Sequence, residues 1–280
     1  MSATTRTFRI VSYNMHGFNQ GAPTVADLLS DKSIGVVLTQ EHWLTPSNLD
    51  KFCSLSDNYF TNGSSATSAS AMSKTIESGM LVGRPFGGVL TMIRNDIRHV
   101  TETIYCSERC SIVRVGDIVF VNLYLPCDGS TDRDIICHDV MADIMSWHEK
   151  YINYEWLITG DFNVDLNGKD SIAGYLNTFI VDNLLTRCDV LFNKVGTATY
   201  INTALNHFSC IDYILISECD KMIDFDVLDP NLNFSDHVPL CAVIKCNFCV
   251  DDSNAANNKP YHASSAKPVH YRWDHADLNS

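Results

Sequence analysis

The chain has 280 residues, of which 45% are hydrophobic and 19% charged, so it can bury a sizeable core and is not composed like a disordered protein. Its 33 acidic side chains outnumber 20 basic ones and give a formal net charge of -13, which argues against a general surface for binding polyanions. A local basic cleft or bound cations can still reverse the sign at a single site.

The sequence gives no sign of export or of a membrane segment. Met1 to Arg9 lacks the apolar run of a signal peptide, and no apolar stretch approaches the length that spans a bilayer. Eleven cysteines are scattered along the chain, and Cys106 and Cys110 have no second pair at zinc-finger spacing. We therefore expect a soluble intracellular protein of the cytoplasm or nucleus, with reduced thiols and no membrane partner.

Short apolar runs predict a series of strands. The first is Phe8–Tyr13, and Val25–Leu29 suggests a short helix after it. The segment Thr61–Gly79, rich in Ser, Ala, Thr and Gly, predicts a long and mobile surface loop. The other expected strands are Gly35–Leu38, Gly88–Ile93, Ile118–Leu125, Trp156–Thr159, Ile211–Ile216 and Pro239–Ile244.

Two helices stand among these strands. Asp132 is the expected N-cap of the first, which carries Ile136, Val140, Ile144, Trp147 and Tyr151 at helical spacing. The second is Ser171–Leu185. Strands and helices are mixed without strict alternation, so the pattern predicts an α/β (α+β) sandwich. We expect one domain over residues 1–246 and a disordered tail or linker over 247–280, where no apolar period remains.

Polar side chains of a few kinds stand where predicted strands end or begin. Carboxylates, carboxamides and one imidazole occur at five successive places along the chain. They are Asn14, Glu41, Asp161 with Asn163, Asp212, and Asp236 with His237.

Any one of these residues alone has an ordinary explanation. An Asp or Asn at a strand end is usually a turn former or a helix cap, and a single His beside an Asp is usually a surface residue. Asp212 differs, because a carboxylate within an apolar strand is costly unless it is paired. His237 is the candidate partner, and the combined pattern is much less frequent by chance than any of its parts.

The residue types favour metal-assisted hydrolysis of a phosphoester. Oxygen ligands such as Glu41 and Asp236 suit Mg²⁺, with Mn²⁺ as the alternative, better than zinc. An imidazole can act as a base or donate to a phosphate, and the amides of Asn14 and Asn163 can hold phosphate oxygens or a water. The sequence has neither a G-x-S-x-G nucleophile motif nor a Walker loop, so water is the expected nucleophile.

In combination and order, these motifs resemble the endonuclease/exonuclease/phosphatase family over roughly Phe8 to Lys245. The resemblance implies a four-layer sandwich of two packed mixed β-sheets flanked by helices, with the site where their loops converge. The segments that carry it are Ser12–Asn14, Gln40–Glu41, Asn122–Pro126, Gly160–Asn163, Ile211–Tyr213 and Ser235–His237.

The resemblance also implies roles for single residues. Glu41 is the expected main metal ligand, with Asn14 and Asp236 nearby, and Asp161 orients or deprotonates the attacking water. Asn163 holds the phosphate, and Tyr124 contacts the scissile phosphate or leaving group. His237, braced by Asp212, faces the phosphate. Thr199 and Ser209 are expected to contact the substrate.

Within the family, three phrases are most like the endonuclease domains of LINE-type (non-LTR) retrotransposons. They are Ser12–Gly17, Gln40–Leu44 and Gly83–Val89, and Tyr271–Leu278 resembles the linker that precedes reverse transcriptase. The implied activity is nicking of one DNA strand to leave a 3′-hydroxyl that primes reverse transcription. The implied partners are DNA and the element's reverse transcriptase domain. Two alternatives stay open: hydrolysis of another phosphoester (RNA, phosphoinositide or sphingomyelin), or a catalytically inactive binding module.

Overall fold

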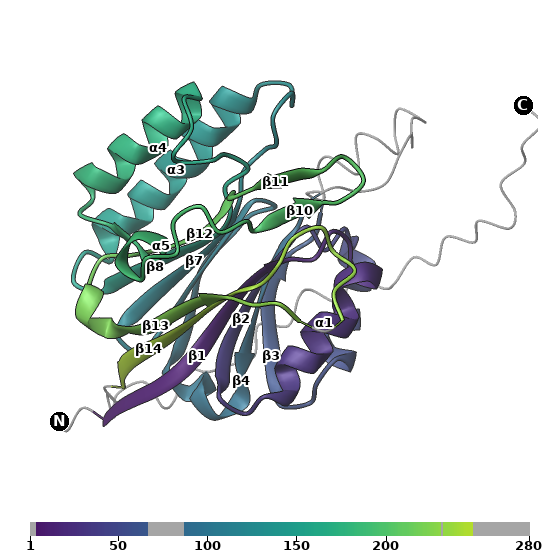
Figure 1. Cartoon of the computed structure of the whole chain (residues 1–280). Helices are drawn as coiled ribbons and strands as arrows, with labels where there is room; N and C mark the ends of the chain where they lie inside the picture. The colour runs from purple at the N-terminus through teal and green to yellow at the C-terminus, as the bar shows by residue number, and fades with distance from the viewer. Residues whose placement is uncertain (1–3, 67–86, 231, 249–280) are drawn as a thin grey trace, which may run out of the picture. The chain divides into compact units, whose positions relative to one another are not determined.

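The computed structural model describes residues 4–66, 87–230 and 232–248, which form two six-stranded β-sheets with helices outside them (Figure 1). The first sheet contains, in order across it, β13 (Met222–Val227), β14 (Leu240–Phe248), β1 (Thr4–Asn14), β2 (Ile34–Gln40), β4 (Val89–Arg94) and β3 (Tyr59–Ser64). The second contains β5 (Thr101–Cys106), β6 (Cys110–Val115), β7 (Ile118–Tyr124), β8 (Glu155–Asp161), β12 (Asp212–Ile216) and β9 (Thr186–Arg187).

Both sheets are mixed. Strand β1 pairs in parallel with β2, and β7 pairs in parallel with β8, whereas the neighbouring pairs are antiparallel. A separate antiparallel hairpin joins β10 (Tyr200–Asn202) to β11 (His207–Ser209). The helical segments are α1 (Phe18–Ser30), α3 (Arg133–Lys150), α4 (Ser171–Asp182) and α5 (Cys188–Leu191), with 3₁₀ segments η1 (Pro46–Ser54), η2 (Asn95–Val100) and η3 (Cys219–Lys221).

Alternation of side chains along the strands produces the layers. In β1, Phe8 and Ile10 face the second sheet and meet Phe120 of β7, whereas Val11 and Tyr13 face the other way, toward Val25 of α1. Each fully buried side chain of this size stabilises the fold by roughly 1.5–3 kcal/mol. Because every central strand is covered on both faces, its sequence is a nearly continuous apolar run.

The outer face of the second sheet is covered by two helices (Figure 1). Val140 and Ile144 of α3 and Leu176 of α4 pack in one cluster with Trp156 and Ile158 of β8. The order of layers is therefore helix, sheet, sheet, helix, which confirms the predicted four-layer sandwich.

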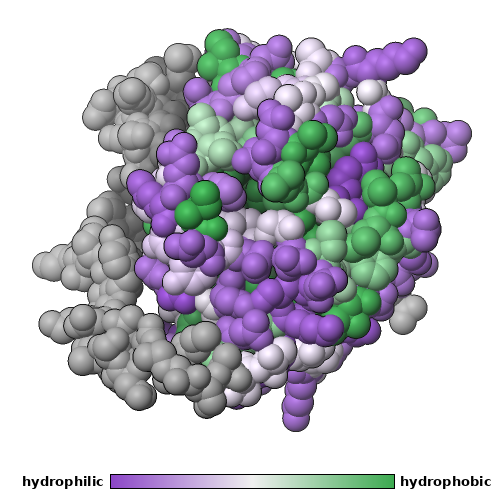
Figure 2. Space-filling view, turned by 90° about the vertical axis from the view of Figure 1, so that its left-hand side faces the viewer, coloured by the Kyte–Doolittle hydropathy of each residue, from purple (hydrophilic) through white to green (hydrophobic). Residues whose placement is uncertain are grey.

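Figure 2 views the molecule from the side on which α4 and α5 lie in Figure 1. Green hydrophobic residues reach the surface there among purple hydrophilic ones. The exposed apolar side chains along this part of the chain include Val181, Leu184, Val190 and Val195. Within the described residues, every helix is too short or too polar to cross a bilayer.

The structure corrects two local predictions. Asp132 precedes α3, but its backbone is left-handed at φ 57° and its side chain makes no capping bond. Asp170, by contrast, caps α4 by accepting from the Ile172 N–H at 2.9 Å. The second predicted helix ends at Asp182, before the left-handed Leu184.

Three other predictions can be compared only in part. The predicted loop at 61–79 begins in strand β3, which runs to Ser64, and its residues 67–79 lie outside the described residues. Strand β14 continues to Phe248, two residues past the expected end of the domain, and the remainder of the expected tail lies outside the described residues. The ten described cysteines are all free thiols, in keeping with the reduced state expected.

Candidate active site

The candidate residues meet because the parallel strands of both sheets end in the same region. Asn14 is the last residue of β1 and Glu41 follows β2, while Tyr124 and Asp161 are the last residues of β7 and β8. Carboxyl ends of parallel strands lie at one edge of a sheet, which is where α/β proteins commonly bind ligands. Asp212 lies beside them because β12 runs antiparallel to β8, and this pairing places Asp212 opposite Asp161.

Asn14 connects the two sheets. Its Nδ2 donates to Asp161 Oδ2 at 2.8 Å and to Glu41 Oε1 at 3.2 Å, and only 1% of the residue is exposed. The His16 N–H donates to Asn14 Oδ1 at 3.0 Å, which fixes the orientation of the amide. One carboxamide therefore links a carboxylate of each sheet.

Backbone strain is concentrated around these residues. Glu41 and Asn163 have φ of 50° and 52°, and His16 and Trp43 have φ of 46° and 56°. A non-glycine residue in the left-handed region costs of order 1–3 kcal/mol and persists where neighbouring structure holds it. Here the Met15 N–H, just after β1, donates to the carbonyl of Gln40, the last residue of β2, at 2.9 Å.

Asp161 is fully buried and receives several donors. The Asn163 N–H donates to Oδ1 at 2.8 Å, and Asn163 Nδ2 donates to Oδ2 at 3.0 Å. Burial, with the nearby carboxylates of Asp212 and Glu41, raises the pKa of Asp161 well above its usual value, although His237 acts in the opposite direction. A carboxylate whose pKa is raised in this way is a stronger base than an ordinary aspartate.

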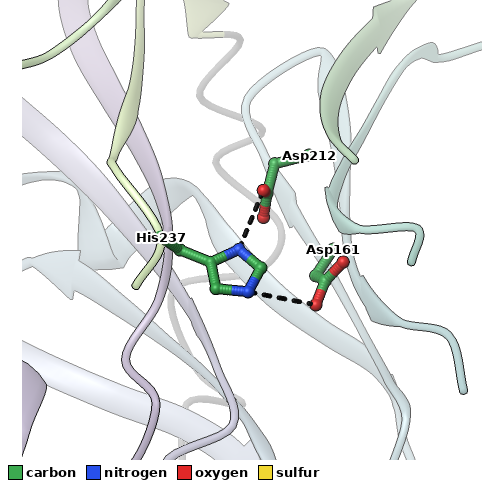
Figure 3. A group of neighbouring side chains, drawn as sticks. All are labelled: Asp161, Asp212 and His237. Atoms are coloured by element: carbon green, nitrogen blue, oxygen red, sulfur yellow. Dashed lines mark hydrogen bonds and ion pairs between the residues drawn. The ribbon is translucent and has the colours of Figure 1, made fainter. Parts of the chain in front are cut away.

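His237 lies between two carboxylates (Figure 3). Its Nδ1 is 2.9 Å from Asp212 Oδ2, and its Nε2 is 3.9 Å from Asp161 Oδ2. Burial by itself would lower the pKa of His237, but Asp212 and Asp161 outweigh it and raise the pKa to about 10. The ring is therefore an imidazolium at neutral pH in the metal-free protein.

Asp236 also lies near Nε2 of His237. Its Oδ1 is 4.0 Å from His237 Nε2 and 2.9 Å from His16 Nδ1. Burial would raise the pKa of Asp236, but the two histidines outweigh it and lower the pKa. Sequence reasoning missed His16, although its position within the quoted Ser12–Gly17 phrase was a signal.

Tyr124 lies at the end of β7, and the guanidinium group of Arg109 lies over its ring. Arg109 stands 5.3 Å from the centre of its ring, and both residues line a cavity of about 240 Å³. Burial raises the pKa of Tyr124, and the charges of Glu41 and Asp161 raise it further, so the phenol stays protonated and can donate.

Thr199 and Ser209 lie beside the backbone segment that leads into Asp212. Thr199 is 1% exposed, and its Oγ1 accepts from the Ile211 and Asp212 N–H groups, both at 3.0 Å. Ser209 ends β11, and its carbonyl accepts from the Thr199 N–H at 2.9 Å. The hydroxyl of Thr199 thus fixes the backbone that carries Asp212.

Two sets of side chains could hold a divalent cation. One is Asp161, Asp212 and His237, which present ligand atoms within 4.8 Å of one another. In that set, however, His237 Nδ1 is engaged by Asp212 and both Asp161 oxygens already accept amide donors.

The other set is Glu41, Asn14 and Asp236, which offers hard oxygen donors. Asp236 Oδ1 is a buried atom whose near partner among the described residues is His16 Nδ1, 2.9 Å away in an ion pair. The carboxylate oxygens of this set suit a divalent cation.

No curated protein sequence matches this chain. The catalytic domain of Xenopus laevis APE2 has a TM-score of 0.66 at 17% identity, with 87% of this chain and 94% of that chain covered. The 3′ phosphatase NExo from Neisseria, bound to a product DNA hairpin, has a TM-score of 0.63 at 16% identity, with 84% and 98% covered.

A third solved structure is the endonuclease domain of TRAS1, a telomere-specific non-LTR retrotransposon. It has a TM-score of 0.60 at 14% identity, with 85% of this chain and 98% of that chain covered. At such identities the likeness concerns the fold. The sequence itself matches the model of one family over residues 11–237, and by that match the chain belongs to the Endonuclease/Exonuclease/phosphatase family.

Proposed function

We propose that this protein is a metal-dependent endonuclease that nicks one strand of DNA and leaves a 3′-hydroxyl. The observation that carries the proposal is the bridge from Asn14 to Glu41 and Asp161, which gathers carboxylates of both sheets around one point. Next to them lies the imidazolium of His237, a cation suited to a phosphate oxygen.

Glu41, Asn14 and Asp236 would hold the divalent cation, which we assign as Mg²⁺ with Mn²⁺ as the alternative. When bound, the ion neutralises phosphate charge and polarises the phosphoryl group. Because the chain is strongly acidic, this local positive charge also matters for bringing a polyanion to the site.

Asp161 is proposed to orient the attacking water and accept its proton. The three amide donors from Asn14 and Asn163 hold the carboxylate in one orientation, and its raised pKa brings its proton affinity closer to that of a base working near neutral pH. The water oxygen then attacks phosphorus, and the bond between phosphorus and O3′ breaks.

His237, Asn163 and Tyr124 are proposed to stabilise the phosphate during this step. His237 Nδ1 is engaged by Asp212, so its Nε2–H is the donor left for a phosphate oxygen. The protonated phenol of Tyr124 can donate to the phosphate or to the departing O3′. We assign Thr199 to the positioning of Asp212, and Ser209, on the neighbouring hairpin, to contact with the substrate.

A role in target-primed reverse transcription is the more specific part of the proposal. It is supported by the resemblance of the Ser12–Gly17 and Gln40–Leu44 phrases to LINE-type endonucleases and by the fold shared with the TRAS1 domain. The partner would be the reverse transcriptase domain of the same element.

A plasmid assay tests the activity. Supercoiled plasmid is incubated with the purified protein and Mg²⁺ or Mn²⁺, and the open-circular product is extended by a DNA polymerase without prior phosphatase treatment. We expect nicks that the polymerase extends directly, since a free 3′-hydroxyl is required. Labelled RNA, phosphoinositide and sphingomyelin run in parallel, and turnover of one of these instead of plasmid would favour the alternative phosphoester.

The assignment of the site is tested with Glu41→Ala and His237→Ala. Each is expected to lose nicking by about 10²–10⁴-fold while remaining folded. Glu149→Ala, at an exposed position on α3, is the matched control and should nick as the parent does. If both site variants nick at the parental rate, the assignment is wrong. If the parent turns over none of the substrates, the inactive binding module is favoured.

A further inference from the structure

Arg133 is the first residue of α3, and its guanidinium joins three other segments of the chain. Its Nη1 donates to Asp170 Oδ2 at 2.7 Å, and its Nη2 donates to the Asn163 carbonyl at 3.0 Å. Its Nε donates to the Pro126 carbonyl in a longer bond of 3.4 Å. Each guanidinium nitrogen therefore donates to an oxygen of the protein.

Asn163, the residue whose carbonyl Arg133 holds, has a strained backbone. Its φ of 52° lies in the left-handed region, which a non-glycine residue keeps only where its surroundings hold it there. The Asn163 N–H donates to Asp161 Oδ1 at 2.8 Å, and Nδ2 donates to Asp161 Oδ2 at 3.0 Å and to the Leu125 carbonyl at 2.8 Å. Asp161 and Leu125 thus hold the N–H and the side chain of Asn163, and Arg133 holds its carbonyl.

The bond from Arg133 to this carbonyl is of the strong kind. A hydrogen bond from a charged guanidinium is stronger than one between neutral groups, and more so where water is largely excluded. Asp170 fixes the guanidinium in turn, because its Oδ1 accepts from the Ile172 N–H at 2.9 Å and caps α4. The planar fork of arginine allows it to donate to Asp170 and Asn163 together. The first turns of α3 and α4 therefore set the orientation of Asn163.

Arg133 is poorly placed to bind a substrate phosphate itself. Its side chain is only 11% exposed, and all three guanidinium nitrogens are engaged by Asp170, Asn163 and Pro126. Its contacts place it behind Asn163, as seen from Asp161. An influence on the reaction would therefore pass through these two residues.

We propose that Arg133 is a positioning residue, which holds Asn163 so that its amide groups keep the Asp161 carboxylate in the orientation that receives the proton of the attacking water. The inference rests on the proposed function, because it concerns the same step. Since Arg133 acts through Asn163 and Asp161, the rate of the chemical step should depend on it and the binding of DNA should not.

Steady-state nicking of plasmid separates these two effects. In Arg133→Met we expect kcat to fall by on the order of 10–100-fold, while KM stays within about twofold of that of the parent. Arg98→Met is the matched control, because it removes the same positive charge from an exposed position on η2. Arg98 follows β4, at the end of that strand away from the pairing of Val89 with Gln40 beside the site. This control should keep the parental kcat and KM.

Amide exchange followed by NMR reads the geometry without relying on activity. The Asn163 N–H, which is bonded to Asp161, should exchange about tenfold faster in Arg133→Met when its rate is divided by that of the Phe120 N–H. Phe120 lies in β7, between β6 and β8, so its exchange reports the stability of the whole sheet. The ratio should be unchanged in Arg98→Met.

Three results for folded Arg133→Met overturn the inference: a parental kcat, a loss that resides in KM, or an unchanged ratio of exchange rates. An equal loss of nicking in Arg98→Met also overturns it, because the net charge would then explain the effect. If Arg133→Met does not fold, Arg133→Lys takes its place. An ammonium keeps the charge but lacks the fork that serves Asn163 and Asp170 together, so kcat should still fall severalfold, and a parental kcat overturns the inference.

The two measurements also separate this inference from the proposed function. A parent that does not nick, together with an exchange ratio that rises in Arg133→Met, removes the endonuclease and leaves Arg133 as the residue that holds Asn163. A parent that nicks, together with unchanged kcat and exchange ratio in Arg133→Met, leaves the endonuclease standing and removes the role of Arg133.

Discussion

The Nδ1 atom of His237 lies 2.9 Å from the carboxylate oxygen Oδ2 of Asp212, which is the first residue of β12. Both side chains are about 5% exposed, so their attraction is only weakly screened by water. The pair fixes the ring and leaves Nε2 facing Asp161.

Replacing the partner of this pair is expected to change the charge of the ring. In metal-free Asp212→Asn, the loss of the nearest negative charge should lower the pKa of His237 from its raised value of about 10. Titration of the imidazole by ¹³C or ¹⁵N NMR checks this, with exposed His99 as the internal reference. Equal midpoints for His237 in parent and variant would contradict the arrangement.

The same pair predicts the sign of a pH effect on stability. A histidine with a pKa raised to about 10 in the folded state, against about 6.5 unfolded, contributes stability that is complete below pH 6.5. This contribution is lost as pH rises toward 10. In the metal-free protein the free energy of unfolding should therefore fall over this window, and less steeply in Asp212→Asn. Urea unfolding at several pH values measures both slopes.

Thr199 is expected to matter for activity without touching the substrate. Thr199→Val removes the acceptor of two backbone N–H groups and should cost about 1–3 kcal/mol of stability for each left unsatisfied. Nicking should fall as well, because one of these groups belongs to Asp212. Thr199→Ser keeps the acceptor and should restore both properties. Nicking unchanged in folded Thr199→Val would mean that Asp212 is held by other contacts.

A buried polar contact joins the two sheets beneath the site. Gln40 Nε2 donates to Asn122 Oδ1 at 2.7 Å, and Asn122 Nδ2 donates to the Thr39 carbonyl at 3.0 Å. Asn122→Ala removes both bonds, while Gln40 Nε2 keeps its contacts with Ser12 Oγ and the Leu38 carbonyl, so we expect the protein to lose about 1–3 kcal/mol of stability in chemical unfolding. Asn58→Ala, at an exposed position before β3, should change stability by less than about 0.5 kcal/mol. A loss for Asn122→Ala no larger than that control would show that the sheets do not depend on this contact.

Binding of a divalent cation should stabilise the protein. The carboxylates of Glu41 and Asp212 lie close enough to Asp161 to raise its pKa, and a bound cation relieves this repulsion. At about 100-fold excess over its dissociation constant, the ion should add about 2.7 kcal/mol, a rise of a few degrees in Tm. Differential scanning calorimetry with and without EDTA measures the shift. Glu41→Ala should lose most of it, and a full shift in that variant would place the ion elsewhere.

The strands show most clearly which parts of the fold can be predicted from the sequence. Central strands such as β1, β7 and β8 were predicted because both their faces are buried, which leaves a nearly continuous apolar run. Edge strands β5 and β13 were missed, since charged and polar residues occupy much of Thr101–Cys106 and Met222–Val227.

For the site, the sequence by itself determined which polar side chains stand at strand ends, because chain connectivity places Asn14, Asp161 and Asp212 directly beside apolar segments. The tertiary structure alone decided that Asn14 spans the sheets to Asp161, 147 positions away, and that His16 faces Asp236. The physical reason is that contacts between distant segments depend on how two sheets pack and twist, and local patterning carries no information about that distance.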